Sequence, residues 1–178
     1  FNISAKSFFQ VNTKQAEVLY NKALEYADLQ GNETVIDAYC GTGTISLFLA
    51  QKAKKVYGIE MIKPAVINAK ENAKNNNIKN VEFIIGDTVE VMPKLYQEGV
   101  KPDVIVVDPP RAGCEKSVLE TFAKMQPSKI VYVSCNPASL ARDIAILAEH
   151  NYQALKIQPV DMFSQTSHVE CVALIERR

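Results

Sequence analysis

The cysteine with the most suggestive setting in the chain follows a run of residues that favour β-strands. Cys135 stands in VYVSCNPAS, and a helical pattern opens after it at Ser139. A residue at this point lies at the carboxyl edge of a strand, where open α/β sheets bind their ligands. A thiolate is a soft nucleophile that can add to an electrophilic carbon and then leave again. We therefore expect Cys135 to face a ligand.

The other three cysteines have no comparable setting. Cys40, Cys114 and Cys171 form no CxxC pair with each other or with Cys135, and the chain has only two histidines. Zinc sites usually combine four such ligands at short spacings, so the sequence predicts no metal site. We expect three reduced thiols that fill small spaces in the core.

Glycines and carboxylates end three other strand-like runs. Gly41 and Gly43 stand in DAYCGTGTI, where the missing side chains let a backbone approach a ligand or simply make a tight turn. Dinucleotide enzymes have a third glycine, but this chain has Ser46 there. Glu60 ends VYGIE and could accept both ribose hydroxyls of an adenosine, or be a solvated charge. Asp87 ends IIGD and could accept from an adenine amino group, or cap a helix.

The glycine turn, the glutamate and the aspartate occur in this order at consecutive strand ends. In this respect residues 30–178 resemble a class I S-adenosylmethionine-dependent methyltransferase. The next strand ends in Asp108-Pro109-Pro110-Arg111. Methyltransferases that modify an exocyclic amine have an aromatic residue at the position of Arg111, so this turn indicates a different target atom.

Alternating periodicities predict the elements that must hold these residues. Short apolar strands alternate with amphipathic helices, which is typical of a mainly parallel sheet. A first helix over 13–28 begins near Asn12 and Gln15 and ends at Gly31 and Asn32. Strands are expected at 34–38, 55–60, 81–87, 102–110 and 129–134, helices at 45–53, 64–76, 88–97, 115–125 and 139–149, and an antiparallel strand pair at 152–162 and 168–177. The sequence predicts an α/β, doubly wound, seven-stranded sheet.

Length and charge limit what the chain could be. Its 178 residues suffice for one domain, and no apolar run reaches the length of a membrane span. Lys plus Arg number 20 and Asp plus Glu number 20, so a strongly basic nucleic-acid surface is not predicted. We expect a cytoplasmic monomer. Because the chain begins at Phe1, we also expect a fragment of a longer protein.

Four motifs in order resemble the RNA 5-methyluridine methyltransferase family, in its C-terminal catalytic domain. They are FFQVN, DPPRAG, SCNP and HVE; the one visible departure is Ser164, where the family usually has proline. The resemblance implies that Cys135 is the nucleophile, that Glu170 accepts the C5 proton, and that Asp108 contacts the uracil edge near the methyl donor.

The same resemblance implies the cofactor and the partner. S-adenosylmethionine would contact Gln10 and Tyr39 besides the strand-end residues. The substrate would be a uridine in RNA, with 23S ribosomal RNA the first expectation and transfer RNA the second. Residues 1–30 would lead into the catalytic core. Most of the RNA contact would come from an upstream domain, whose presence, like that of an iron–sulfur cluster, the sequence leaves open.

Two other functions remain possible at this point. An RNA 5-methylcytosine methyltransferase typically has a second motif cysteine directly after the proline at the fourth strand end, whereas Cys114 lies several residues further on. A non-catalytic S-adenosylmethionine-binding module would be expected to lack the thiol or the base. Glu170 could instead be exposed on an edge strand, and the sequence does not decide the roles of Arg111 and His168.

Overall fold

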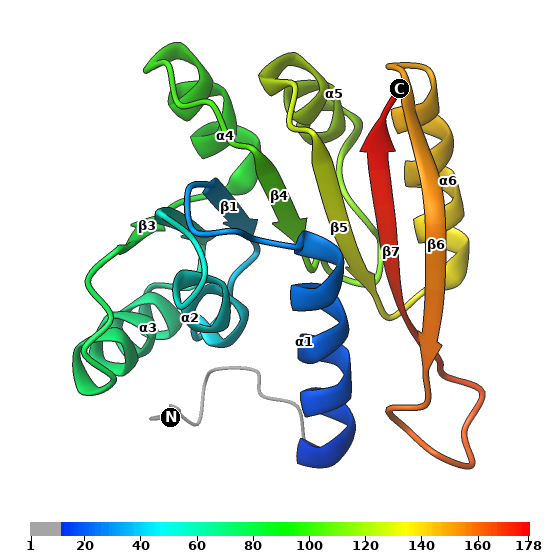
Figure 1. Ribbon diagram of the computed structural model, residues 1–178. Coiled ribbons are helices and arrows are strands. Elements are labelled where there is room, and N and C mark those ends of the chain that lie inside the picture. The colour runs from blue at the N-terminus through cyan, green and yellow to red at the C-terminus, as the bar shows by residue number, and fades with distance from the viewer. Residues whose placement is uncertain (1–11) are drawn as a thin grey trace.

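The computed structural model describes residues 12–178 as one mixed sheet covered by helices (Figure 1). The strand order is β3-β2-β1-β4-β5-β7-β6, and β7 runs antiparallel to both of its neighbours. The strands are β1 (Thr34–Ala38), β2 (Lys55–Glu60), β3 (Val81–Ile85), β4 (Val104–Val107), β5 (Lys129–Ser134), β6 (Tyr152–Val160) and β7 (Glu170–Arg177). The helices are α1 (Thr13–Ala27), α2 (Thr44–Ala50), α3 (Lys63–Asn75), α4 (Thr88–Gln97), α5 (Lys116–Met125) and α6 (Pro137–Ala148).

Helices cover both faces of the sheet. α1, α2 and α3 pack on one face, where the buried residues include Leu19, Leu49 and Val66. α4, α5 and α6 pack on the other, with Met92, Phe122 and Leu140 in its core. The predicted doubly wound, mainly parallel sheet with an antiparallel pair at its end is therefore confirmed. Within residues 12–178, no helix is both long and apolar enough to cross a bilayer.

Caps explain where two helices begin and end. The Asn12 side chain accepts a hydrogen bond from the Gln15 N–H at 3.3 Å, as expected for the start of α1. α1 ends earlier than expected, because Asp28 has a left-handed backbone (φ 48°) that stops the helix after Ala27. α6 begins at Pro137 and not at Ser139, since a proline needs no amide partner in a first turn.

The position of β7 brings Glu170 to the same edge of the sheet as Cys135. β7 lies between β5 and β6, so the strand that carries Glu170 is not an edge strand and the exposed alternative for Glu170 is wrong. In the antiparallel register Ser134 pairs with Cys171. Cys135 follows Ser134, and Glu170 precedes Cys171. The two residues therefore stand at the same end of neighbouring strands.

Candidate active site

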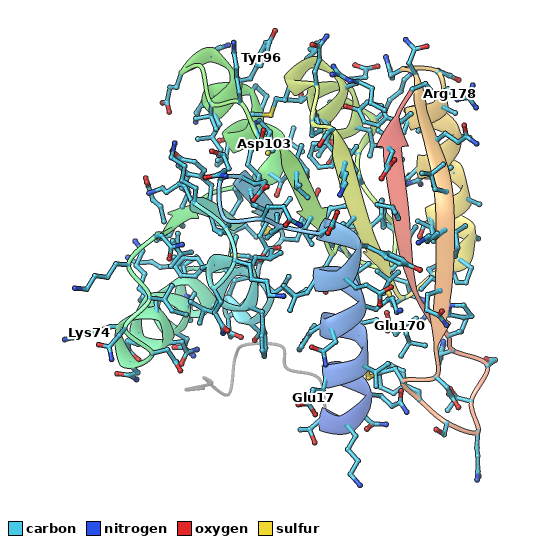
Figure 2. The ribbon with its side chains drawn as sticks, in the orientation of Figure 1. Glu17, Lys74, Tyr96, Asp103, Glu170 and Arg178 are labelled. Carbon is cyan, nitrogen blue, oxygen red and sulfur yellow. The ribbon has the colours of Figure 1, made fainter. Side chains whose placement is uncertain are left out.

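Four polar side chains lie on the α1 side of the sheet, at its carboxyl edge. Side chains alternate between the two faces of a strand, so residues two apart share a face. Each of the four stands two residues from a buried valine of the core beneath α1; these valines are Val35, Val106, Val133 and Val172. The four polar residues are Asp37, Asp108, Cys135 and Glu170. In Figure 2, Glu170 lies beside α1, at the opposite edge of the sheet from Asp103.

A cavity of about 440 Å³ opens at this edge. Ligand sites for small molecules and cofactors usually have about this size. Six of the residues predicted from the sequence line it together, from the ends of five different strands: Tyr39, Gly41, Glu60, Asp108, Cys135 and Glu170. The structure thus places part of the predicted cofactor residues, namely Tyr39, Gly41 and Glu60, in one cavity with the predicted reacting residues.

Cys135 differs from the other cysteines in its exposure. Cys40, Cys114 and Cys171 are buried, whereas Cys135 is partly exposed, and all four are free thiols. Burial raises the pKa of the Cys135 thiol, and the nearby carboxyl groups of Glu170 and Asp108 raise it further. The Arg111 guanidinium and a backbone hydrogen bond act in the opposite direction. In the free protein the thiol is therefore protonated at neutral pH.

The two carboxyl groups next to this thiol also hold protons more firmly than usual. Burial and the proximity of Glu170, with a contribution from Asp37, raise the pKa of Asp108 to about 8. Glu170 is only 4% exposed, and burial raises its pKa as well. At a pKa of about 8, Asp108 can give or take a proton near neutral pH, and the raised pKa of Glu170 makes it a stronger base than an exposed glutamate.

The turn between β1 and α2 leaves an open backbone beside a fixed carboxylate. Glu60 accepts hydrogen bonds from the Gly41 N–H at 3.0 Å and from the Ile62 N–H at 2.7 Å. Gly41 has φ 54°, and a Cβ built there would meet no atom within 4 Å. Tyr39, just before it, has a left-handed backbone with φ 63°, which costs about 1–3 kcal/mol in a non-glycine residue.

Two of the predicted residues that the structure describes lie outside the cavity. Gly43 lacks a side chain for a packing reason, because a Cβ there would come within 2.7 Å of the Phe83 ring. Asp87 is exposed and caps α4, accepting from the Val89 N–H at 2.9 Å, as one of its two sequence interpretations proposed. Neither Gly43 nor Asp87 lines the cavity. Gln10 lies outside the described residues.

The two residues without a predicted role come together at the cavity mouth. An Arg111 guanidinium nitrogen lies 3.4 Å from Nδ1 of His168, and both side chains are exposed. Arg111 also lines the cavity with Cys135. Among the described residues that line the cavity, Arg111 is the one basic side chain, and His168 lies beside it.

Sequence reasoning missed two groups that the cavity uses. Tyr20 of α1 is a member of the apolar stripe of its helix, yet its side chain lines the cavity. Burial raises its pKa to about 12, and Asp108, Asp37 and Glu170 add to the shift. Met61 and Ile62 also line the cavity, although their side chains are 62% and 45% exposed. Their signal in the sequence was two large apolar residues directly after a strand-end glutamate.

The residues of the cavity fit S-adenosylmethionine. The open backbone at Gly41 allows close approach, the Glu60 carboxylate suits ribose hydroxyls, and Met61 and Ile62 offer apolar surface. The carboxyl groups of Asp108 and Glu170 suit a cationic ligand. Within residues 12–178, no group of three or more His, Cys, Asp or Glu side chains is arranged to hold a metal ion.

A family model matches the whole chain. The family described as tRNA (uracil-5-)-methyltransferase matches residues 1–178. A protein of Clostridium tetani described as an uncharacterized RNA methyltransferase is 63% identical over 175 residues. A protein of Bacillus cereus with the same description is 60% identical over 177 residues. The alignments cover 98% and 99% of this chain but only 38% of each relative, so the chain spans well under half of their length.

Solved structures share the fold. The tRNA (uracil-54, C5)-methyltransferase of Pyrococcus abyssi, in complex with S-adenosyl-L-homocysteine, is 36% identical with a TM-score of 0.85. That match covers 97% of this chain and 40% of the other. A precorrin-6y C5,15-methyltransferase of Geobacter metallireducens has a TM-score of 0.78 at 13% identity, covering 99% of this chain and 94% of the other. The second likeness shows the fold alone.

Proposed function

The chain belongs to the tRNA (uracil-5-)-methyltransferase family, and from that premise we propose that it is the catalytic domain of an RNA uridine-C5 methyltransferase that uses S-adenosylmethionine. One observation carries the proposal. Cys135, Asp108 and Glu170 line the same cavity as Gly41 and Glu60, the residues suited to the cofactor.

The thiol supplies what uracil lacks. C5 of uracil is a poor nucleophile, but addition of the Cys135 sulfur to C6 converts C4–C5–O4 into an enolate. The thiol must lose its proton for this step, because the thiolate is the nucleophilic form. S-adenosylmethionine, when bound, supplies a methyl group on a positively charged sulfonium. C5 of the adduct would then bond to this methyl carbon as its bond to the sulfonium sulfur breaks, S-adenosylhomocysteine would leave, and the C6–S bond would stay in place.

Glu170 then completes the exchange. After methyl transfer, C5 carries both its original hydrogen and the new methyl group. The Glu170 carboxylate removes the C5 proton, the C5–C6 double bond re-forms, and the C6–S bond breaks to release the Cys135 thiolate. Burial of Glu170 raises its pKa, which makes it a stronger base than an exposed glutamate.

Asp108 has a second capability that its sequence position alone did not reveal. With its pKa at about 8, its carboxyl group is neutral at neutral pH in the free protein. A neutral carboxyl group accepts a hydrogen bond at one oxygen and donates at the other. We propose that Asp108 uses both on the uracil edge, and that its donor stabilises charge that develops on the enolate oxygen.

The cofactor would be held by the strand ends. Glu60 is proposed to accept from the ribose hydroxyls, since its two oxygens are already fixed by backbone N–H groups and keep further lone pairs. Gly41 gives the backbone access, and Tyr39 lines the same wall. Asp87 is proposed to use the carboxylate oxygen that does not cap α4 for the adenine amino group. Gln10 is proposed to contact the cofactor as well.

Release of tritium from uridine C5 tests this function. The full-length protein is incubated with S-adenosylmethionine and RNA labelled with tritium at uridine C5, and we expect methylation and tritium release in equal amounts. Cys135→Ala should abolish both, and Cys171→Ala, a change at a buried neighbour, serves as the matched control. Methylation of C5 by the Cys135→Ala protein would contradict the proposed chemistry.

The RNA is chosen by parts of the protein beyond the catalytic residues. We propose a uridine in 23S ribosomal RNA as the target, with transfer RNA as the alternative that the Pyrococcus abyssi neighbour favours. Regions outside this chain are proposed to make most of the RNA contacts, because the chain itself has no net charge. Mapping the 5-methyluridine that is lost when the gene is deleted distinguishes the two RNAs.

A further inference from the structure

The turn after β4 contains residues that the proposed reaction does not use. Asp108 and Arg111 of the motif DPPRAGC face the cavity, but the Ala112-Gly113-Cys114 segment points elsewhere and lines a separate hollow with Arg142. These residues hold no group suited to the chemistry of uracil. Their backbone, however, is contacted closely by α6, the helix that follows Cys135.

The ladder between β4 and β5 stops before the reacting residues. The last pair is Val107 with Tyr132, so no strand pairing holds Asp108 at a fixed distance from Cys135. Both residues stand at strand ends, where a turn can shift without breaking the sheet. The Asp108 N–H donates to the Ala38 carbonyl oxygen at 3.3 Å on the β1 side, so on the β5 side other contacts must fix the turn against the segment that carries the thiol.

Arg142 supplies part of that set. Its Nη2 donates to the carbonyl oxygens of Ala112 at 2.9 Å and Cys114 at 3.1 Å. The same guanidinium donates to Asp143 Oδ1, through Nε at 2.8 Å and through Nη2 at 2.6 Å. One side chain of α6 therefore holds two carbonyl groups of the turn and is itself oriented by a carboxylate.

Asp143 supplies the complementary contacts. It is fully buried, and its Oδ2 accepts from the Cys114 N–H at 2.7 Å and from the Tyr132 hydroxyl at 2.5 Å. A buried carboxylate is costly unless it is paired and hydrogen-bonded, and here all of its partners come from the turn, from β5 or from Arg142. Asp143 thus joins the turn to Tyr132, the last residue of β5 that pairs with β4.

Asn136, which follows Cys135, and Ser139 of α6 also contact the turn. The Arg111 carbonyl oxygen accepts from the Asn136 side-chain amide at 3.1 Å and from the Ser139 hydroxyl at 3.2 Å. Gly113 allows the close approach, because a Cβ there would lie 2.6 Å from Arg142 Nη2 and 2.7 Å from Asp143 Oδ2. The glycine of the DPPRAG motif therefore has a structural reason unrelated to cofactor binding.

We propose that Arg142 and Asp143 are positioning residues that fasten the Asp108–Cys114 turn to the segment carrying Cys135. They touch neither substrate nor cofactor and act through Asp108 and Arg111. Their contacts fix the uracil-binding carboxyl group and the cavity-mouth guanidinium relative to the thiol. Misplacement of reacting groups by about 1 Å can cost on the order of 100-fold in rate, so the attachment has kinetic consequences. The inference deepens the proposed function and rests on it for its catalytic part.

Arg142→Ala in the full-length protein tests the attachment. The Arg142 side chain is 52% exposed, so its removal opens no cavity in the core, but it takes the cation away from the buried Asp143; the melting temperature and the active fraction are therefore measured beside the rate. Lys116→Ala is the matched control, since Lys116 is an exposed cation of the neighbouring α5 whose nearest acidic partner, Glu120, lies 3.9 Å away. Arg142→Lys keeps the charge but loses the planar fork of donors.

We expect the single-turnover rate of methyl transfer, at saturating RNA and S-adenosylmethionine, to fall at least about tenfold in Arg142→Ala. The Kd for S-adenosylhomocysteine should stay within about twofold, because the cofactor residues belong to other strand ends. Arg142→Lys should recover part of the rate, and Lys116→Ala should match the wild type. A purely structural role would instead lower the melting temperature and the active fraction without changing the rate per active site.

Amide hydrogen exchange over residues 111–114 provides a readout that does not depend on activity. It should accelerate in Arg142→Ala and stay unchanged in Lys116→Ala. Unchanged exchange together with an unchanged transfer rate would overturn the attachment. A wild-type protein that methylates no RNA, but whose turn still loosens in Arg142→Ala, would overturn the proposed function and leave the attachment standing.

Discussion

The groups around Cys135 shift the pKa of its thiol in both directions. Burial raises the pKa of its thiol, and the nearby carboxyl groups of Glu170, the proposed base, and Asp108, the proposed partner of the uracil edge, raise it further. Arg111 is the side chain that opposes them. These influences favour the protonated thiol in the free protein, so the proposed mechanism requires the thiolate to form in the complex with cofactor and RNA.

The pH dependence of thiol alkylation tests this balance. Removing a carboxylate near the thiol should stabilise the thiolate, so in Glu170→Gln the alkylation of Cys135 by iodoacetamide should reach its midpoint at lower pH than in the wild type. Arg111→Ala removes the favourable charge and should move the midpoint upward. Alkylation is measured by mass spectrometry of the peptide that contains Cys135. Shifts in the same direction for both variants would contradict the assignment of these charges.

Asp37 is a second residue whose protonation matters, here for stability. It is fully buried, its Oδ1 has no hydrogen-bond partner within residues 12–178, and burial raises its pKa from 3.8 to about 7. In the unfolded chain the group loses its proton near pH 4, whereas in the folded protein it keeps it until near pH 7. Its contribution to the free energy of unfolding is therefore full at low pH and declines as pH rises between these values.

Asp37→Asn should remove this decline. The free energy of unfolding of wild type and variant, from denaturant titrations at pH 5 and pH 8, should favour the variant more at pH 8, by an amount on the order of a few kcal/mol. Asp161→Asn, a change at an exposed aspartate, is the control. An equal difference between variant and wild type at both pH values would show that Asp37 is not protonated in the fold.

At the scale of the element, the β1–α2 turn uses two glycines for two different purposes. Gly41 faces the cavity with open space around it, whereas Gly43 lies against the Phe83 ring. Both have positive φ, 54° for Gly41 and 79° for Gly43, so each change to alanine carries a backbone cost of about 1–2 kcal/mol. The difference between the two sites lies in what the new methyl group meets.

Gly41→Ala and Gly43→Ala should therefore fail in different ways. Gly43→Ala adds a clash 2.7 Å from Phe83 and should lower the melting temperature more than Gly41→Ala does. Gly41→Ala places a methyl group at the cavity wall and should weaken S-adenosylhomocysteine binding more for the same loss of stability. Thermal melts and calorimetric titration of both variants check this. The reverse order of the two effects would contradict the separate purposes.

The elements themselves were largely predictable from the sequence, because hydrophobic periodicity reports burial directly. The boundaries of β1, β2 and β5 agree with the expectation, and the carboxyl edge is where Cys135 was expected. The start of α6 at Pro137 was missed because the helical pattern in the sequence begins at Ser139. In the structure Asn136 caps the helix, which begins two residues earlier. The insertion of β7 between β5 and β6, which buries Glu170, could not be predicted from a pattern within one segment.

At the scale of the whole molecule, the sequence predicted those site residues that belong to a motif. It did not predict the residues that reach the site through packing between distant segments. Tyr20 enters the cavity only because α1 lies across the sheet. The contacts of Arg142 and Asp143 depend on how α6 meets a turn about 30 residues earlier in the chain. Such relations combine distant segments, and a periodic pattern within one segment contains no information about them.

The balanced charge of the chain leads to a prediction about RNA affinity. Phosphate contacts by Lys and Arg supply most non-specific affinity for RNA, and this chain has equal numbers of acidic and basic residues. We expect the full-length protein to bind its RNA at least about tenfold more tightly than residues 1–178 alone, as measured by filter binding at matched salt concentrations. Equal affinities would place the RNA-binding surface within this chain.

The covalent bond between Cys135 and uridine C6 is the central claim, and trapping it is the most direct test. In full-length Glu170→Gln the base that releases the thiolate is missing, so the methylated adduct should accumulate with RNA and S-adenosylmethionine. We expect a complex that survives denaturing electrophoresis, and mass spectrometry should place a methylated uridine on the Cys135 peptide. Glu170→Gln combined with Cys135→Ala should give none. A trapped nucleotide on another residue, or turnover without any adduct, would contradict this mechanism.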